Sequence, residues 1–282
     1  MLDIFSRYKE KGLDSGVVEA FRNEILGYYR EHGRRFPWRE TDDPYHLLVS
    51  EVMLQQTQTS RVIGKYGEFL AAFPDVRTLA ESSLVDVLRV WQGLGYNRRA
   101  MLLRKTAREI LTRFGGRIPS DTVVLRTLPG VGDYTAGAIA AIAFNLPSPF
   151  IDTNIRTVYH WFFFRDREKV ADKEMMPVIE QTFDASAPRI WCFALFDYGV
   201  MLKQSNTGLP SQIKKQSRFS GSDRQIRGEI LRLLLESESL PEDKLAARFP
   251  DDGNRLRRII GRLHEEGLIR NENGVIRISP DG

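Results

Sequence analysis

The chain has very little cysteine, since Cys192 is its only one. A single thiol cannot form an internal disulfide, a multi-cysteine metal site or an iron–sulfur cluster. The sequence also has no run of about eighteen apolar residues, the length that a membrane-spanning helix needs. Its first residues, from Met1 to Arg7, contain no apolar signal core. We therefore expect a cytoplasmic protein without a disulfide or a multi-cysteine metal site. We also predict that it binds no metal and no other cofactor.

The alternation of polar and apolar residues that is typical of a β-strand is absent from residues 17–203. Apolar residues recur there at helical spacing instead. Asp43-Pro44 begins one helix, because an N-cap residue followed by proline suits the first helical turn. Gly115-Gly116 ends another helix, which covers about residues 98–113. We expect residues 1–203 to form an all-α domain.

Helical periodicity stops over residues 204–222, which are rich in Ser, Gly, Pro and Lys and are expected to form a linker. Between residues 203 and 227 the chain has six basic residues against one acid, Asp223. A solvated tether would have this composition, and so would an arm that contacts phosphates. Composition alone leaves both interpretations open.

Residues 223–282 have the pattern of a small separate domain. Apolar residues at helical spacing predict a first helix around residues 226–234, a second around 245–249 and a third around 256–263. Asn273-Gly274 then lies between two short β-prone runs, a strong signal for a β-hairpin. Three helices and a hairpin predict a winged-helix-like α+β domain.

Three arginines of the third helix, Arg255, Arg258 and Arg262, fall on one helical face. A helix that enters a DNA groove would carry such a face. A solvated surface and a docking surface for a protein partner are the alternatives. The whole chain is mildly basic, with a net charge of +4 and a pI of about 9.2. This balance permits nucleic-acid binding without proving it.

Glu51 lies in an apolar helical segment, on the same face as Leu47 and Leu54. Burial of an acid disfavours its charged form, so the pKa of Glu51 should rise and suit a proton donor near neutral pH. The alternative is a structural ion pair with an arginine such as Arg39.

Four polar residues follow this segment, and their side chains can bind base edges or the backbone of a nucleic acid. Solvated residues at a helix end are the ordinary alternative. The four are Gln55, Gln56, Thr57 and Gln58.

A Gly-x-Gly turn in Leu128–Gly132 connects two helical segments. Gly130 and Gly132 can take positive φ, and the turn then directs backbone N–H groups toward a phosphate. The small-residue helix that follows can pack closely against another element. Together these features predict a helix-hairpin-helix that grips a phosphate.

Asp152 follows this turn by about twenty residues. Its simplest interpretation is a helix N-cap, since Thr153-Asn154 and a helical pattern come next. With a phosphate-binding turn upstream, a carboxylate here can also stabilise a positively charged sugar. Glu51 and Asp152 would then be the two carboxylates that hydrolysis of a glycosidic bond uses.

Six short runs carry a resemblance to a known family: Phe36–Arg39, Asp43–Tyr45, Ser50–Gln58, Trp91–Tyr96, Leu128–Gly132 and Ile151–Asn154. In combination they resemble the helix-hairpin-helix DNA glycosylase superfamily, and within it the MutY-type adenine glycosylases. The resemblance covers roughly residues 20–200. It implies a two-lobed all-α fold and a monofunctional base excision repair enzyme that flips a mispaired base and hydrolyses its N-glycosidic bond. The implied base is adenine opposite guanine or 8-oxoguanine.

The resemblance also implies a role for each matching residue of the catalytic centre. Glu51 would protonate the leaving base, Asp152 would stabilise the cationic sugar, and Asn154 would orient this pair. Tyr134 stands where related lyases carry a nucleophilic lysine, which implies that strand cleavage through a Schiff base is absent. Tyr96 would wedge into the base stack beside the opposite base.

The implied partner is double-stranded DNA with a mismatch or lesion, bound by a monomer at the nucleoid of a bacterium or archaeon. Gln55, Gln56 and Thr57 would read the opposite strand, with Gln58 beside them. The hairpin residues Leu128, Gly130, Val131 and Gly132 would hold the DNA backbone. The base pocket would be formed or bordered by Arg34, Phe36, Trp38, Arg39, Leu54, Phe193 and Phe196.

The chain departs from the family in three ways. The four cysteines that usually hold a [4Fe–4S] cluster would fall near Lys203, Pro210, Ile213 and Phe219, so we expect no cluster. A winged-helix-like domain stands in place of the family's MutT-like domain. The glutamate that reads adenine aligns with Phe193, which cannot accept a hydrogen bond from the adenine amino group.

These departures leave two alternatives to adenine removal. One is a glycosylase for another base, such as thymine or uracil opposite guanine. The other is a DNA-lesion binder without activity. The retained Glu51, Asp152 and Asn154 argue against the latter, because a binder does not need a buried carboxylate pair.

Overall fold

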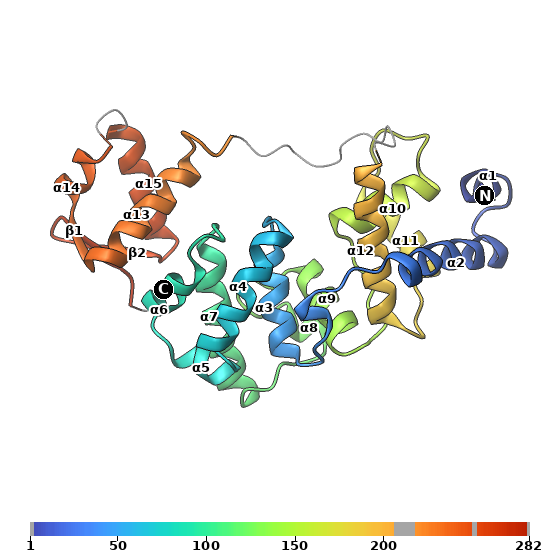
Figure 1. Cartoon of the computed structure of the whole chain (residues 1–282), viewed down its shortest axis with the longest axis horizontal. Helices are drawn as coiled ribbons and strands as arrows, with labels where there is room; N and C mark the ends of the chain where they lie inside the picture. Colours follow the sequence, from blue (N-terminus) through green and yellow to red (C-terminus); the bar gives the residue numbers. More distant parts are fainter. Residues whose placement is uncertain (1–2, 206–217, 250–252, 281–282) are drawn as a thin grey trace. The chain divides into compact units, whose positions relative to one another are not determined.

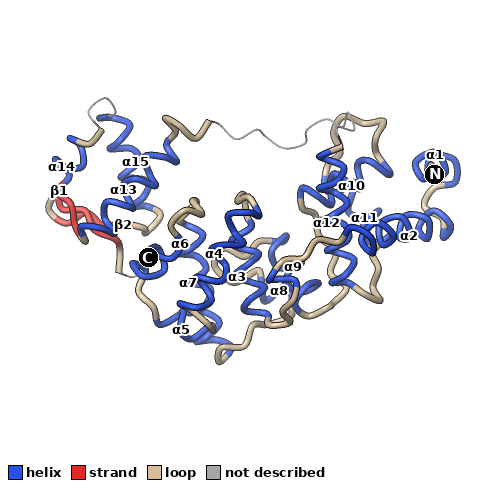
Figure 2. Tube along the Cα trace, in the orientation of Figure 1, coloured by secondary structure: helices blue, strands red, loops and turns tan. Residues whose placement is uncertain are grey.

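The structure is a computed structural model, and it describes residues 3–205, 218–249 and 253–280 (Figure 1). Helices dominate this part of the chain, and its strands all lie in the C-terminal segment (Figure 2). The expected all-α fold with a small α+β domain after it is therefore confirmed. Among the described residues, no helix combines the length and apolar character needed to cross a membrane. The chain divides into two compact units, each made of segments that are distant in sequence.

The first unit contains the described residues of 1–47, 120–126 and 131–215, and its core is aromatic. The ring of Phe21 meets those of Tyr159 and Trp191 edge-on, at centroid distances of 5.3 and 5.7 Å. The helices of this unit are α1 (Ile4–Lys11), α2 (Ser15–His32), the 3₁₀ turn η1 (Pro37–Arg39), α8 (Thr122–Leu125), α9 (Asp133–Ala143), α10 (Thr153–Phe163), α11 (Asp172–Thr182) and α12 (Pro188–Gln204). Packing of α10 against α12, which carries Trp191, joins the middle of the chain to its later part.

The second unit contains the described residues of 48–119, 127–130 and 216–282. Helix α3 (Pro44–Leu54) begins in the first unit and ends in the second. The other helices before the hairpin are α4 (Thr59–Ala72), α5 (Val76–Glu81), α6 (Leu84–Trp91) and α7 (Arg98–Phe114). Helices α5 and α6 pack against α7. Gly115, in the left-handed region at φ +62°, ends α7 as the sequence predicts.

The C-terminal domain consists of α13 (Asp223–Ser237), β1 (Ser239–Pro241), α14 (Glu242–Ala247), α15 (Gly253–Glu265), β2 (Ile269–Glu272) and β3 (Val275–Ile278). The strands form an antiparallel sheet in the order β1-β3-β2. Asn273 and Gly274, at φ +53° and +79°, make the predicted hairpin turn. The second helix begins earlier than predicted and also ends earlier, at Ala247. Strand β1 was not predicted, because three residues are too short to show an alternation and pair only with the distant β3.

Candidate active site

Asp152 is the N-cap residue of α10, and both of its carboxylate oxygens accept hydrogen bonds. Oδ1 accepts from the backbone N–H groups of Asn154 and Ile155 at 2.9 and 2.6 Å. Oδ2 accepts from the Asn154 side-chain amide at 3.0 Å. Burial raises the pKa of Asp152 above its ordinary value, while the Ile155 hydrogen bond and the positive charge of Lys203 oppose the rise. Capping therefore holds this carboxylate in one position. An N-cap residue held in this way can also stabilise a positively charged sugar, so the two interpretations of Asp152 are compatible.

Lys203, near the end of α12, contacts the same helix start. Its Nζ donates to the Asn154 side-chain oxygen at 2.7 Å and to Thr153 Oγ1 at 3.3 Å. Burial lowers the pKa of Lys203, and the negative charge of Asp152 opposes this effect. The ammonium, the Asn154 amide and the Asp152 carboxylate thus form one chain of hydrogen bonds. Sequence reasoning counts Lys203 only among the basic residues of a tether or phosphate-contacting arm and misses its contact with Asn154, since only the fold brings the two together.

Gly199 explains how α12 comes so close to the start of α10. A Cβ at position 199 would lie 2.5 Å from the backbone oxygen of Asn154. Only a residue without a side chain leaves room for this approach. Lys203 lies one turn further along α12, directly over Asn154. The small residue and the lysine therefore act together to fix the Asp152–Asn154 pair.

Tyr134 lies in the first turn of α9 and is half-buried. Its ring meets the ring of Phe150 edge-on at 5.6 Å, and Phe150 in turn lies 6.1 Å from Phe196. Close packing continues at Gly137, where a Cβ would be 2.8 Å from that of Phe150. Tyr134 and Phe196, two residues predicted for the site, are thus linked through Phe150, which sequence reasoning missed.

Arg34 and Arg39 both bind Asp197, a buried acid on α12. Arg39 donates to its two oxygens at 2.8 and 2.9 Å, and Arg34 Nε donates at 2.7 Å. Burial raises the pKa of Asp197, but the hydrogen bonds of both arginines and the charge of Arg39 outweigh this effect and hold the pKa below its ordinary value. Sequence reasoning missed Asp197, although an acid within an apolar helix is a signal of the same kind as Glu51.

Three of the other residues predicted for the base pocket, Phe36, Trp38 and Phe193, lie around these arginines, whereas Phe196 lies near Phe150. Phe36 stacks on Trp38 at 5.0 Å with the rings 10° from parallel. The Arg39 guanidinium lies over the ring of Phe193, 4.5 Å from its centroid. Phe193 is almost wholly buried, so its ring is part of the core of the first unit. Leu54, the last residue of α3, belongs to the second unit.

Glu51 lies in the part of α3 that belongs to the second unit, and only 6% of it is exposed. The neighbouring Leu48, Val49 and Met53 are buried as well. The helix is therefore buried on more than the single face through Leu47 and Leu54 that the sequence predicts. Burial of Glu51 agrees with the expected environment of a proton donor, and its raised pKa stays a prediction.

The polar residues Gln55 to Gln58 form the turn between α3 and α4, with Gln56 in the left-handed region at φ +55°. Arg99 holds this turn. Its Nη1 donates to the backbone oxygens of Val52 and Met53 at 2.7 and 2.9 Å, and its Nη2 donates to Thr57 Oγ1 at 2.9 Å. Burial lowers the pKa of Arg99 to about 10. Sequence reasoning missed this role, because an exposed arginine has the same local pattern.

The hairpin differs in one respect from its prediction. Gly130 has φ +78°, and a Cβ there would lie 3.0 Å from that of Leu102, so glycine is required. Gly132, at φ −94°, has ordinary extended backbone and N-caps α9, so the expectation of positive φ was wrong for it. Leu128 and Val131 are buried, because they anchor the hairpin. Their buried side chains cannot contact a phosphate, so only the backbone N–H groups of Leu128 and Val131 could bind one.

Arg255 and Arg258 on α15 bind within the C-terminal domain. Arg255 Nε donates to Asp223 at 2.7 Å, and Arg258 donates to the same carboxylate at 3.3 Å. Arg262 lines a pocket together with Gln55, Gln56 and Tyr96. The three arginines that share a helical face in sequence thus have two different surroundings.

Comparison with known proteins identifies the family. The model of the HhH-GPD superfamily of base excision DNA repair proteins matches residues 49–181. An adenine DNA glycosylase of Mycolicibacterium smegmatis is 30% identical over 268 residues, which are 87% of this chain and 91% of that protein. The chain belongs to the HhH-GPD superfamily.

A human relative and a solved structure are also similar to this chain. The adenine DNA glycosylase of Homo sapiens is 40% identical over 77% of this chain and 42% of its own length. The chain spans about half of the length of several curated relatives that it matches. Among solved structures, a thermostable thymine-DNA glycosylase has a TM-score of 0.62 and 27% identity over 65% of this chain and 86% of its own.

The residues at the positions of the superfamily's usual cluster cysteines do not fit an iron–sulfur cluster. Such a cluster needs thiolates, and Lys203 supplies an ammonium that is bound to Asn154. Phe219 is apolar and 61% exposed, while Pro210 and Ile213 lie outside the described residues. The single thiol, that of Cys192, is buried in α12. Among the described residues, no group of three or more His, Cys, Asp or Glu could hold a metal ion.

Proposed function

We propose that this protein is a monofunctional DNA glycosylase that removes adenine mispaired with guanine or 8-oxoguanine. The observation that carries the proposal is the placement of Asp152, whose carboxylate is fixed by two backbone N–H groups and the Asn154 amide. A fixed carboxylate can stabilise the positive charge that develops on a sugar as its glycosidic bond breaks. The names of the curated relatives support adenine as the base.

Each residue then has one task. Glu51, buried on α3, donates a proton to the leaving base. Asp152 stabilises the cationic sugar, Asn154 orients Asp152, and Lys203 orients Asn154. Water completes the hydrolysis. Tyr134 offers a phenol rather than an amine, so it cannot form a Schiff base with the sugar. Borohydride should accordingly trap no covalent protein–DNA complex.

The DNA partner is a duplex with a mismatch or lesion, and the protein acts on it as a monomer. The backbone N–H groups at the start of α9, beside Gly130 and Gly132, are suited to bind a phosphate. The stacked pair of Phe36 and Trp38 is suited to border a flipped base. These assignments rest on the family and on the local geometry of each segment.

A second candidate substrate is thymine or uracil opposite guanine. The observation in its favour is Phe193, whose apolar ring under Arg39 offers no acceptor to an adenine amino group. The solved structure named as a thymine-DNA glycosylase, with 27% identity, adds support.

Single-turnover base release from four duplexes tests the proposal. They carry adenine opposite 8-oxoguanine, adenine opposite guanine, thymine opposite guanine and uracil opposite guanine. We expect adenine release, with Glu51→Gln slower by about 100-fold or more, as for loss of a general acid. Both proteins should bind a duplex with an abasic-site analogue equally well. Release of thymine or uracil alone would establish the second candidate. Tight binding with no release from any duplex would identify a non-catalytic lesion binder.

A further inference from the structure

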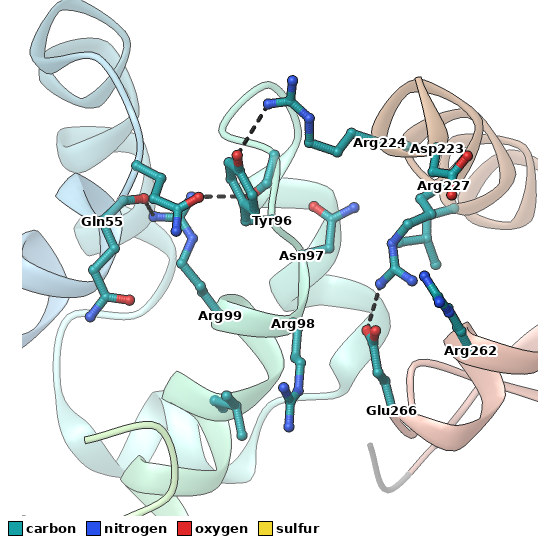
Figure 3. Close-up of a pocket in the computed structure, with 15 residues that line it drawn as sticks. Gln55, Tyr96, Asn97, Arg98, Arg99, Asp223, Arg224, Arg227, Arg262 and Glu266 are labelled. Carbon is teal, nitrogen blue, oxygen red and sulfur yellow. Dashed lines mark hydrogen bonds and ion pairs between the residues drawn. The ribbon is translucent and has the colours of Figure 1, made fainter. Parts of the chain in front are cut away.

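A pocket of about 530 Å³ lies within the second unit and joins elements from two parts of the chain (Figure 3). Gln55 and Gln56 border the pocket from the turn after α3. Tyr96 borders it from the segment before α7, and Arg98 borders it from the first turn of α7. The C-terminal domain contributes residues of α13 and α15, among them Arg224, Arg227 and Arg262.

The arginines of the pocket outnumber its acids, and the acids are already paired. Glu266 binds Arg227 at 2.5 Å, and Asp223 binds Arg255, which lies outside the pocket. Arg98 and Arg262 are exposed. Within the described part of the chain, neither side chain has a hydrogen bond or a close ion pair, and Arg262 acts on Asp223 only through its charge, which helps to lower the pKa of that carboxyl. Two guanidinium groups left over in a concave site favour an anion with several acceptor oxygens.

Tyr96 is held at the edge of this pocket in an unusual backbone conformation. Its φ is +49°, a region that residues with a side chain rarely adopt. The Arg224 guanidinium of α13 donates to the tyrosine hydroxyl at 3.1 Å, as Figure 3 shows. The Arg99 guanidinium lies 5.4 Å from the centre of the same ring. The C-terminal domain therefore helps to fix an aromatic ring next to unpaired positive charge.

The pocket thus combines an aromatic ring, three side-chain amides and several arginines. Such groups bind a nucleic-acid strand, because rings stack on bases and arginines bind phosphates. The alternative, in which Arg255, Arg258 and Arg262 together enter the groove of a separate duplex, fits less well. Asp223 holds Arg255 and Arg258 within the domain.

We propose that the C-terminal domain completes the DNA-binding surface beside Tyr96, with Arg98 and Arg262 binding phosphates of the strand opposite the excised base. The choice of strand rests on the proposed function, in which Tyr96 enters the stack next to the opposite base. The C-terminal domain thereby binds DNA at the lesion itself rather than binding a separate stretch of duplex.

The salt dependence of DNA binding tests the phosphate contacts. Arg98→Gln and Arg262→Gln are compared with Arg257→Gln, a matched control that removes the same charge from an exposed position of α15 outside the pocket. The DNA is a duplex with an abasic-site analogue, so base release is not required. Each pocket variant should lower the slope of log affinity against log salt by about 0.9, and the control should leave it unchanged. Equal slopes for all variants and the wild type would overturn the proposal.

Neutral methylphosphonate linkages then identify the strand. Placed beside the opposite base, they should weaken wild-type binding roughly tenfold, as expected for loss of a charged hydrogen bond. The same linkages should weaken Arg262→Gln much less, since its contact is already gone. The strand assignment is wrong if only linkages in the lesion strand weaken wild-type binding more than they weaken binding by Arg262→Gln. Neither the salt dependence nor the methylphosphonate experiment requires base release. A failure of adenine release would therefore refute the proposed function without affecting the test of the phosphate contacts.

Discussion

Lys203 Nζ lies 2.7 Å from the side-chain oxygen of Asn154, although the two residues are 49 positions apart. That oxygen accepts from the lysine, so the amide nitrogen of Asn154 is turned toward Asp152 and donates to it at 3.0 Å. The direction of the amide, and with it the support for the carboxylate, is thereby determined. Burial raises the pKa of Asp152, and the positive charge of Lys203 opposes this rise.

Lys203→Met should slow single-turnover base release about tenfold at pH 7, as for loss of one charged hydrogen bond. Removal of the positive charge raises the pKa of Asp152 further, so less of it is ionised at a given pH. The acidic limb of the pH–rate profile should therefore move to higher pH. Lys203→Arg retains the charge and should keep the limb near its wild-type position.

Lys169→Met removes an equal charge from an exposed position of the first unit and serves as the control. It should change neither the rate nor the profile. A Lys203→Met profile that superimposes on the wild-type one would show that the lysine has only a structural role.

Gly199→Ala should lower both stability and activity. The new Cβ would overlap the backbone oxygen of Asn154 and force α12 away from α10. We expect a loss of about 1–3 kcal/mol in the free energy of unfolding, typical of overpacking. Urea denaturation measures this loss, and base release measures the displacement of Asn154. Gly64→Ala in α4, where a Cβ meets nothing within 4 Å, should be neutral or stabilising.

Asp197→Asn should destabilise the protein by about 3 kcal/mol, because it leaves two arginines without their carboxylate. This figure is at the low end of the usual range, since the Arg34 side chain is 36% exposed and water can solvate it. The pKa of Asp197 is lowered in the fold, so its contribution is present above the unfolded-state value near 3.9 and disappears as the pH falls through the folded-state value. Urea denaturation at pH 7 and near pH 3 should show a smaller difference at the lower pH.

His160 should make the protein less stable as the pH falls from 7 toward 5. The residue is buried, which lowers its pKa below the ordinary value near 6.5. The unfolded chain then binds more protons than the folded one between those two values, so the free energy of unfolding rises with pH there. His160→Gln, which can still donate to the Arg167 carbonyl, should flatten this dependence. A slope equal to that of the wild type would rule out His160 as its source.

Several features of the site could be predicted because their causes are local. Asp152 caps α10, Gly115 ends α7, and Asn273-Gly274 turns the hairpin, each through bonds or angles within a few residues. The prediction failed at Gly132, where a Gly-x-Gly pattern does not specify which glycine takes the positive φ. It was also incomplete at α14 and β1, whose short sequences carry weak periodicity.

By itself the sequence determined the helical character of the chain, the two buried-carboxylate candidates, the hairpin and the absence of cluster cysteines. Only the tertiary structure decided which side chains hold these groups. Asp197 meets Arg34 across 163 positions, Arg224 meets Tyr96 across 128, and Lys203 meets Asn154 across 49. No local pattern encodes such contacts, because the side chains find each other only when packed helices bring distant segments of the chain together.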